Sequence, residues 1–169
     1  MNLNDLPVGL EMTIPEEYLD FLGHMNVMYY THLFDRATWA FYDQFGFGRE
    51  YHTQSGFGSF ALEGHARYLS EVRVGQKVRL RTRLIARSDK LMHAMHFMEK
   101  EDGTLAATSE FLGVHIDLST RRSAPYPPQV AAGLDALLAK HRALGWDAPL
   151  SGAIGVGKKN AAGGHAALG

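Results

Sequence analysis

The chain has 169 residues, of which 46% are hydrophobic and 21% charged, and its formal net charge is −1. This length and composition predict one soluble globular domain, and the balanced charge gives no indication of nucleic-acid binding or of disorder. The lack of cysteine excludes disulfides, thiolate metal sites and cysteine nucleophiles, and it favours a cytoplasmic protein. We find no signal-peptide pattern and no apolar run of about 20 residues, so we expect no membrane contact.

The first predicted elements are a short strand at residues 12–19 and a long helix from Val27 to Phe45. Asn26 is a suitable residue for the start of the helix, and Gly46 is suitable for its end. Apolar residues recur along this segment at spacings of three and four, which predicts a helix buried on a broad face. The residues of this face are Val27, Tyr30, Leu33, Phe34, Ala37, Ala40, Phe41 and Phe45.

Residues 47–58 are rich in glycine and polar residues, so we predict a loop. Four strand-like segments follow at residues 60–72, 77–87, 91–100 and 104–118. Their connections are short and turn-like, which predicts an antiparallel meander.

Residues 127–144 begin with prolines and continue with a helical pattern, so we predict a second, outer helix. We assign residues 1–147 to a single domain, and residues 148–169 to a flexible tail rich in glycine and alanine. The order of elements predicts an α+β fold in which a strongly curved antiparallel sheet wraps around one central helix.

The basic residues of segment 77–87 alternate with valine and leucine, which predicts a solvent-exposed strand face. Glu63, Glu71 and Glu99 are available as cross-strand partners for them. Binding of a phosphate by one or two of these arginines is the alternative.

His93 and His96 form an HxxH pair, which invites a metal-site interpretation. On a strand, however, residues three apart point to opposite faces. We therefore expect no shared metal ion.

Asp20, Gly23, His24 and Asn26 lie together just before the long helix, within the stretch LDFLGHMN. One interpretation is structural, with a strand end, a turn and a helix cap. The other is functional, because N–H groups at a helix N-terminus can stabilise an oxyanion while a nearby carboxylate activates water or attacks directly. The second interpretation describes an acyl-hydrolysis site without serine or cysteine.

The stretch PEEYLDFLGHMNVMYYTHLFDRA resembles the start of the central helix of hotdog-fold acyl-CoA thioesterases, the 4-hydroxybenzoyl-CoA thioesterase-like group. The Asp-x-x-Gly-His-hydrophobic-Asn signature carries the resemblance, and the branch with a GHMN core is the most similar. The later stretches HARYLSEVRVGQKVRLRTRL, GTLAATSEF and HIDLSTRRSAPYPP resemble that branch in the same order. The resemblance covers residues 12–144 and implies a hotdog fold with a C-terminal outer helix.

The resemblance implies that Asp20 is the catalytic carboxylate, as nucleophile or general base, and that the backbone N–H near Val27 polarises the thioester carbonyl. His24 and Asn26 are expected to shape the turn, and Asn26 also to orient water or substrate. Further expected contacts with substrate come from Gly23, Met28, Glu63, His65 and Arg67.

Arg121 and Arg122 are candidate contacts for the phosphates of coenzyme A, with surface charge as the alternative. The resemblance also implies a homodimer or homotetramer with its active sites at subunit interfaces. We expect no metal and no resident cofactor, since coenzyme A is part of the acyl-CoA substrate. Met25, Met28, Tyr29 and Tyr30 are expected either to line an acyl pocket or to belong to the core.

Leu22 and Val27 depart from the GHMN branch, in which the corresponding positions are often asparagine. A non-hydrolytic acyl-CoA-binding protein is therefore one alternative. A hotdog enoyl-CoA hydratase is another, and it would pair His24 with Asp35. Asp35 is also the alternative catalytic acid, because some hotdog enzymes carry their acid on the central helix.

Overall fold

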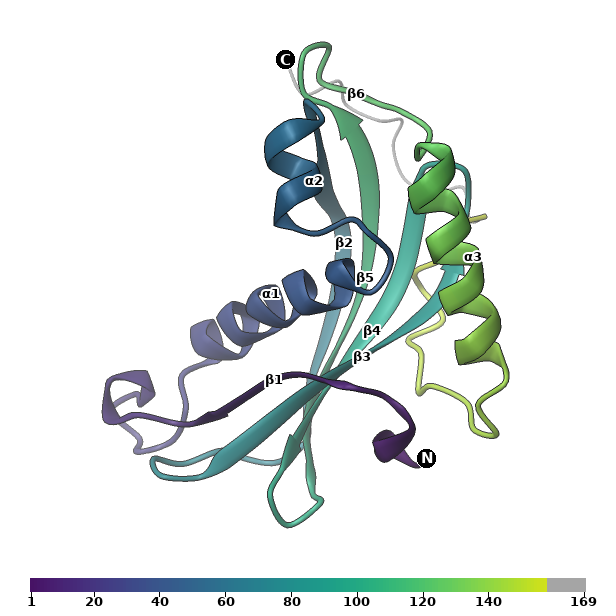
Figure 1. Ribbon diagram of the computed structural model, residues 1–169. Helices are drawn as coiled ribbons and strands as arrows, with labels where there is room; N and C mark the ends of the chain where they lie inside the picture. Colours follow the sequence, from purple (N-terminus) through teal and green to yellow (C-terminus); the bar gives the residue numbers. More distant parts are fainter. Residues whose placement is uncertain (158–169) are drawn as a thin grey trace.

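A computed structural model describes residues 1–157 and contains one curved antiparallel sheet around a long helix (Figure 1). The strands are β1 (Val8–Thr13), β2 (Phe57–Tyr68), β3 (Lys77–Arg87), β4 (Leu91–Lys100), β5 (Leu105–Asp117) and β6 (Arg122–Ser123). The helices are α1 (Val27–Asp43), α2 (Arg49–Gln54) and α3 (Pro128–Arg142), with short 3-10 helices η1 (Leu3–Asp5) and η2 (Glu16–Tyr18).

The predicted central helix is confirmed as α1. Leu33, Ala37 and Phe41 lie four residues apart on one stripe and are at most 1% exposed. Full burial of a leucine or phenylalanine side chain contributes roughly 1.5–3 kcal/mol, so this stripe anchors the helix to the sheet. Asn26 caps the N-terminus through its side chain, and Gly46 follows the helix with a φ of +71°. This left-handed backbone favours glycine.

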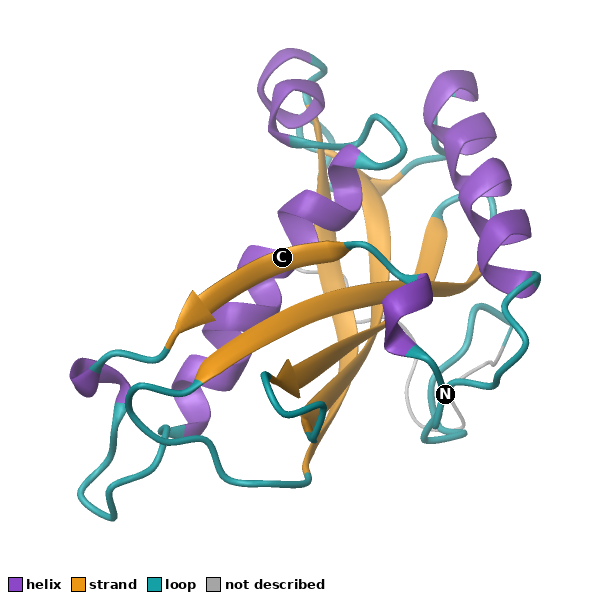
Figure 2. Ribbon diagram, turned by 60° about the horizontal axis from the view of Figure 1, so that its bottom comes forward, coloured by secondary structure: helices purple, strands orange, loops and turns teal. Residues whose placement is uncertain are grey.

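The four predicted strands after α1 are present, but their predicted order in the sheet is wrong for one of them. The spatial order is β1-β3-β4-β5-β2, so only β3, β4 and β5 form a meander. Strand β2 crosses the molecule and pairs with β5 from Phe57 to Tyr68. In Figures 1 and 2, β1 and β3 pass over one side of α1, so the curved sheet encloses the helix. Strand β2 stands at the end of the strand order, so it is an edge strand.

Two predictions near the N-terminal half of the chain are wrong. The first strand lies at Val8–Thr13 rather than 12–19, because Pro15 follows it and residues 16–18 form η2. Proline lacks the N–H that a strand ladder needs. The predicted loop at 47–58 contains the short helix α2, whose N-cap is Gly48.

The second predicted helix is confirmed as α3, which lies along the second half of β3. Strand β1 pairs with β3 only as far as Arg81, which leaves the remaining edge of β3 open to other partners. His141 Nδ1 accepts the N–H of Leu84 at 2.9 Å, and Asp135 forms an ion pair with Arg87. Helix α3 therefore covers a sheet edge that would otherwise expose unpaired backbone groups.

The prediction of a solvent-exposed basic face on β3 is wrong for Arg81 and Arg83, which are 7% and 8% exposed. The guanidinium of Arg81 donates to the carbonyl of Leu6, and that of Arg83 donates to the carbonyls of His141 and Trp146. Segments from both ends of the domain thus cover this face. The backbone carbonyls replace the water that the two cations would otherwise contact.

His93 and His96 lie on opposite faces of β4, as predicted. His93 bonds to Glu110 at 2.8 Å, whereas His96 lies between the hydroxyls of Thr38 and Thr82. Burial lowers the pKa of His96 to about 3, so its ring is neutral. Within residues 1–157 there is no group of three or more His, Asp or Glu side chains that could hold a metal ion.

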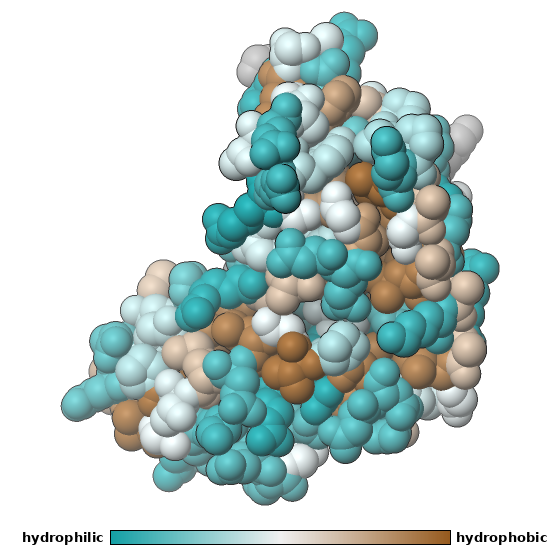
Figure 3. Space-filling model, viewed as in Figure 1, coloured by the Kyte–Doolittle hydropathy of each residue, from teal (hydrophilic) through white to brown (hydrophobic). Residues whose placement is uncertain are grey.

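Part of the predicted tail packs against the domain. The N–H of Ser151 donates to Glu110 Oε2 at 2.7 Å, and Ile154 is 7% exposed. Residues 158–169 lie outside the described part of the chain. No helix among the described residues is long and apolar enough to span a membrane. The face in Figure 3 is largely polar, with apolar side chains gathered in its middle.

Candidate active site

A tight turn before α1 brings Asp20 and His24 together. The N–H of Asp20 donates to the carbonyl of His24 at 3.0 Å, and the N–H of Gly23 donates back to the carbonyl of Asp20 at 3.1 Å. Gly23 has a φ of +84°, which a residue with a side chain adopts only with strain. The glycine therefore closes the turn that sets Asp20 beside the helix N-terminus.

The carboxylate of Asp20 is held at both oxygens. Oδ2 lies 3.5 Å from Nδ1 of His24, and Oδ1 accepts the backbone N–H of Leu22 at 2.8 Å. The Asp20 side chain is 20% exposed, so it still reaches solvent. The side chain of Leu22 is itself exposed, so the contact with Asp20 uses only the backbone and does not depend on the residue type at this position.

The start of α1 leaves one backbone donor free for a ligand. The first N–H groups of a helix have no acceptor within the helix. Here Asn26 Oδ1 accepts from Met28, and the Asn26 carbonyl accepts from Tyr29. Among residues 1–157 no acceptor bonds to the N–H of Val27. This N–H and the helix dipole favour a negative charge at the mouth of α1.

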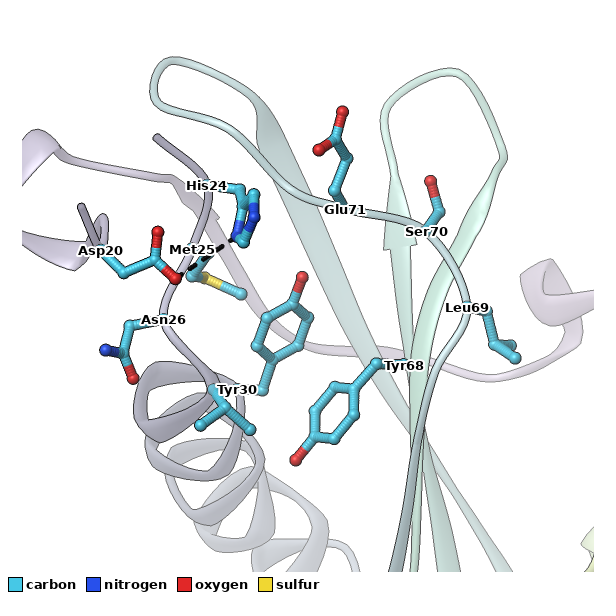
Figure 4. Close-up of a pocket in the computed structure, with 10 residues that line it drawn as sticks. Asp20, His24, Met25, Asn26, Tyr30, Tyr68, Leu69, Ser70 and Glu71 are labelled. Atoms are coloured by element: carbon cyan, nitrogen blue, oxygen red, sulfur yellow. Dashed lines mark ion pairs between the residues drawn. The ribbon is translucent and has the colours of Figure 1, made fainter. Parts of the chain in front are cut away.

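A solvent-open pocket of about 420 Å³ lies between this turn and the segment that follows β2 (Figure 4). Its lining residues are Asp20, His24, Met25, Asn26, Val27, Tyr30, Tyr68, Leu69, Ser70 and Glu71. Met25 fixes the two walls together, because its N–H donates to the carbonyl of Val72 at 2.7 Å. Asp20 and Val27 thus both line one pocket.

Two tyrosines form the floor of this pocket. The rings of Tyr30 and Tyr68 meet edge to face, with centroids 5.1 Å apart. Tyr30 is buried and Tyr68 is half exposed. Burial raises the pKa of the Tyr30 hydroxyl, so the side chain stays a neutral phenol.

The structure brings together Asp20, His24, Asn26 and Val27, which the sequence analysis had placed in one site. Gly23 shapes the turn but does not line the pocket, and Met28 is 60% exposed outside it. Tyr29 stacks on Tyr18 at 3.9 Å and also lies outside.

The other predicted contacts do not reach this pocket within one chain. Glu63, His65 and Arg67 lie along β2 and are absent from the lining. Arg121 and Arg122 lie at the turn between β5 and β6, at the opposite end of the sheet in Figure 1. Arg121 packs over the ring of Phe60 at 5.0 Å.

The sequence analysis missed the second wall of the pocket, residues 68–71. Tyr68 ends β2 and the other three residues follow it. The sequence analysis quoted them within the stretch HARYLSEVRVGQKVRLRTRL but assigned none of them to the site. They reach the site because β2 pairs with β5 instead of β3. The resemblance of this stretch to the GHMN branch was the signal that could have drawn attention to the segment.

A curved antiparallel sheet around one helix, with an acid and a free N–H at the helix start, is a hotdog fold suited to acyl transfer. A hypothetical protein from Staphylococcus aureus, solved in complex with CoA, is 26% identical, with a TM-score of 0.75 over 84% of this chain and 90% of that one. A putative thioesterase from Pseudomonas putida KT2440 is also 26% identical, with a TM-score of 0.72 over 91% and 95% of the two chains.

The chain belongs to the thioesterase-like superfamily, whose model matches residues 14–134. It is 34% identical to a betainyl-CoA thioesterase of Pseudomonas aeruginosa over 79% of this chain and 85% of the relative. An L-carnitine dehydrogenase/betainyl-CoA thioesterase of Agrobacterium fabrum is 31% identical over 80% of this chain, which covers 28% of that longer protein. The predicted family and fold are confirmed, and the enzyme class is thioester hydrolase.

Proposed function

We propose that the protein hydrolyses an acyl-CoA thioester to the free acid and coenzyme A. The observation that carries this proposal is the convergence of the Asp20 carboxylate and the free N–H of Val27 on one pocket. The carbonyl oxygen of the thioester accepts the Val27 N–H, which stabilises the negative charge of the tetrahedral transition state. Asp20, held by His24 and by the backbone of Leu22, faces the carbonyl carbon.

Asp20 can act by either of two routes. As a general base it takes a proton from water while the water oxygen bonds to the carbonyl carbon, and the C–S bond then breaks to release the thiolate. As a nucleophile it forms a mixed anhydride as the thiolate leaves, and water then hydrolyses the anhydride. A single turnover in ¹⁸O-labelled water tests the nucleophilic route in one direction: label in the protein shows attack by Asp20 followed by hydrolysis at its own carboxyl carbon.

The names of the relatives suggest the first substrate to test. Betainyl-CoA joins a short cationic acyl group to coenzyme A, and we propose this compound as a substrate of the present protein. Arg121 and Arg122 stay candidate contacts for the phosphates of coenzyme A. Hydrolysis needs water as its only co-substrate. A cytoplasmic location of the protein stays a prediction.

We also propose that the working enzyme is a homodimer joined through β2. This strand has 12 residues, pairs with β5 on one side and lies at the edge of the sheet. Leu62 and Tyr68 on it, and Leu69 directly after it, are each more than 40% exposed. A long apolar edge strand invites pairing with another chain. A second subunit would bring its own Glu63, His65 and Arg67 near this edge. Light scattering of the purified protein tests the assembly, and a monomer at micromolar concentration contradicts it.

A panel of acyl-CoAs with detection of free thiol tests the activity. We expect turnover on at least one thioester, and a loss of about 10²–10⁴-fold in Asp20→Asn. Asp35→Asn tests the alternative catalytic acid in the same assay, and we expect it to stay active because Asp35 is exposed on α1 outside the pocket. Full activity of Asp20→Asn would remove this residue from the mechanism. Tight binding without turnover would identify a binding protein instead, and hydration of an enoyl-CoA would identify a hydratase.

A further inference from the structure

We propose that the pocket selects an acyl group bearing a quaternary ammonium, through the rings of Tyr30 and Tyr68 and the carboxylate of Glu71. This inference rests on the proposed thioesterase function, and it assigns the recognition of the acyl group to residues of this chain.

The charges around the pocket favour a cation. Two carboxylates, Asp20 and Glu71, line it, and no lysine or arginine is among the described residues that do so. Asp20 is committed to His24 and the Leu22 backbone, whereas Glu71 lies on the opposite wall. Lys100 and Arg73 bond to the lining residues Ser70 and Glu71 but do not line the pocket themselves. The charged side chains that a cationic acyl group meets on the pocket wall are therefore the two carboxylates, which lowers the cost of its desolvation.

Among the described residues, Glu71 is held only by an exposed ion pair. Its carboxylate bonds to Arg73 at 2.6 Å, but the two side chains are 51% and 64% exposed. An ion pair this exposed contributes little and rearranges readily. Glu71 can therefore face the pocket when a permanent cation is present.

The two aromatic rings supply the face that a quaternary ammonium needs. Such a cation has no N–H to donate, so it is recognised by the negative faces of aromatic rings. Tyr30 is 5% exposed, while Tyr68 is 49% exposed and projects its ring from the end of β2 toward α1. Their edge-to-face arrangement forms a corner with a centroid separation of 5.1 Å. The thioether of buried Met25 adds a polarizable surface beside this corner.

The position of the corner sets the length of the acyl group. Tyr30 lies three residues after Val27 on α1, and residues with this spacing are neighbours on one helix face, about 5–6 Å apart. A carbonyl at the Val27 N–H therefore brings the substituent on the next carbon close to the Tyr30 ring. This geometry fits an ammonium that is separated from the carbonyl by one carbon atom.

The test compares two thioesters that differ only in charge. Trimethylammonioacetyl-CoA carries the cation, and 3,3-dimethylbutanoyl-CoA replaces the nitrogen by carbon with the same shape. We expect the wild-type kcat/KM to be at least tenfold higher for the cationic thioester. We expect Tyr68→Leu to lower this ratio by about 5- to 30-fold, and Tyr68→Phe to keep it within about threefold. Glu71→Gln is expected to lower the ratio by about threefold, whereas Glu50→Gln on α2 is the matched charge control.

The outcomes separate this proposal from the function on which it rests. Equal or faster hydrolysis of the neutral thioester overturns the cation selectivity while the thioesterase activity stands. An unchanged ratio in Tyr68→Leu, checked for native folding by circular dichroism, overturns the role of the ring. If the wild type hydrolyses neither compound, the proposed betainyl-CoA substrate fails, the panel of acyl-CoAs still tests the thioesterase activity, and calorimetry decides the selectivity. Equal Kd values for the two thioesters would contradict it, and a lower Kd for the cationic one would support it.

Discussion

The side-chain oxygen Oδ1 of Asn26 accepts the backbone N–H of Met28 at 2.9 Å. This single bond caps α1, and the N–H of Val27, a residue that lines the pocket, has no acceptor among the described residues. The cap and the candidate oxyanion site are therefore two parts of one arrangement, and separate variants can test each part.

Removal of the Val27 N–H is possible without disruption of the helix. Proline is well tolerated at the first position of a helix, and Asn26 has the extended backbone, with ψ of 141°, that a residue before proline requires. We expect Val27→Pro to keep the fold and to lower kcat by about 10²–10³-fold, because it deletes the donor to the oxyanion. Val27→Ala keeps the N–H and is the matched control. Steady-state kinetics measure kcat of the two variants, and equal kcat values would exclude the Val27 N–H as the donor.

Loss of the cap has a separate effect on stability. Asn26→Ala removes the acceptor for Met28 and should lower the free energy of unfolding by about 1 kcal/mol. Asn26→Ser keeps a capping oxygen and should lose much less. Urea denaturation of the three proteins measures these differences. Equal midpoints for the alanine and serine variants would mean that the side chain contributes nothing as a cap.

The close approach of α3 to the end of α1 depends on Gly133. A Cβ at this position would lie 2.9 Å from the carbonyl oxygen of Phe45 and 3.0 Å from its Cβ. Gly133→Ala should therefore destabilise the protein by about 1–3 kcal/mol, despite the better helix propensity of alanine. Gly145→Ala is the control, since no heavy atom lies within 4 Å of its Cβ. Thermal unfolding should rank the two variants in this order, and a Gly133→Ala variant as stable as wild type would show that the helices shift freely.

Buried His96 predicts a loss of stability in acid. Burial lowers its pKa to about 3, whereas an unfolded histidine has a pKa of about 6.5. The unfolded state therefore binds more protons below pH 6.5, and this residue should lower the free energy of unfolding by about 1.4 kcal/mol per pH unit down to pH 3.

Two variants isolate this contribution. His96→Phe keeps the ring stack between Phe34 and Phe111 and should flatten the pH dependence, although it loses two hydrogen bonds. Thr82→Val removes the hydroxyl at Nδ1 but leaves the histidine, so its pH dependence should stay steep. Urea unfolding at pH 6, 5 and 4 gives the slopes. Equal slopes in wild type and His96→Phe would refute the assignment.

Local patterns were sufficient to predict the bounds of β3 and β4, at 77–87 and 91–100, to the residue. The alternation of side chains and the turn residues that bound each strand both lie within the segment itself. They therefore predict the strand without any distant contact. The pairing of β2 was predicted wrongly because its own alternation fits a place beside β3 as well as one beside β5. The choice between these partners is made by tertiary packing around α1.

The candidate site also has one part that the local sequence predicts and another that only the tertiary fold determines. Asp20, His24, Asn26 and Val27 were predictable because they lie within eight residues, where a turn and a helix start fix their relative positions. Residues 68–71 were not predicted, because the crossing of β2 to β5 brings them to the pocket. The burial of Arg81 and Arg83 was missed for a related reason, since the segments that cover them come from outside the strand.

Those two arginines also bear on how the domain unfolds. Arg81 is bonded to residues of the N-terminal segment, and Arg83 to His141 in α3 and to Trp146 after it. The indole of Trp146 also donates to Asp5 at 3.1 Å. Release of either segment would leave a guanidinium in a partly dehydrated site without one of its carbonyl partners. The free-energy cost of this loss opposes local opening. Residues close to both ends of the sheet-forming region should therefore exchange their amide hydrogens as slowly as the central strands, and the domain should unfold in one cooperative step.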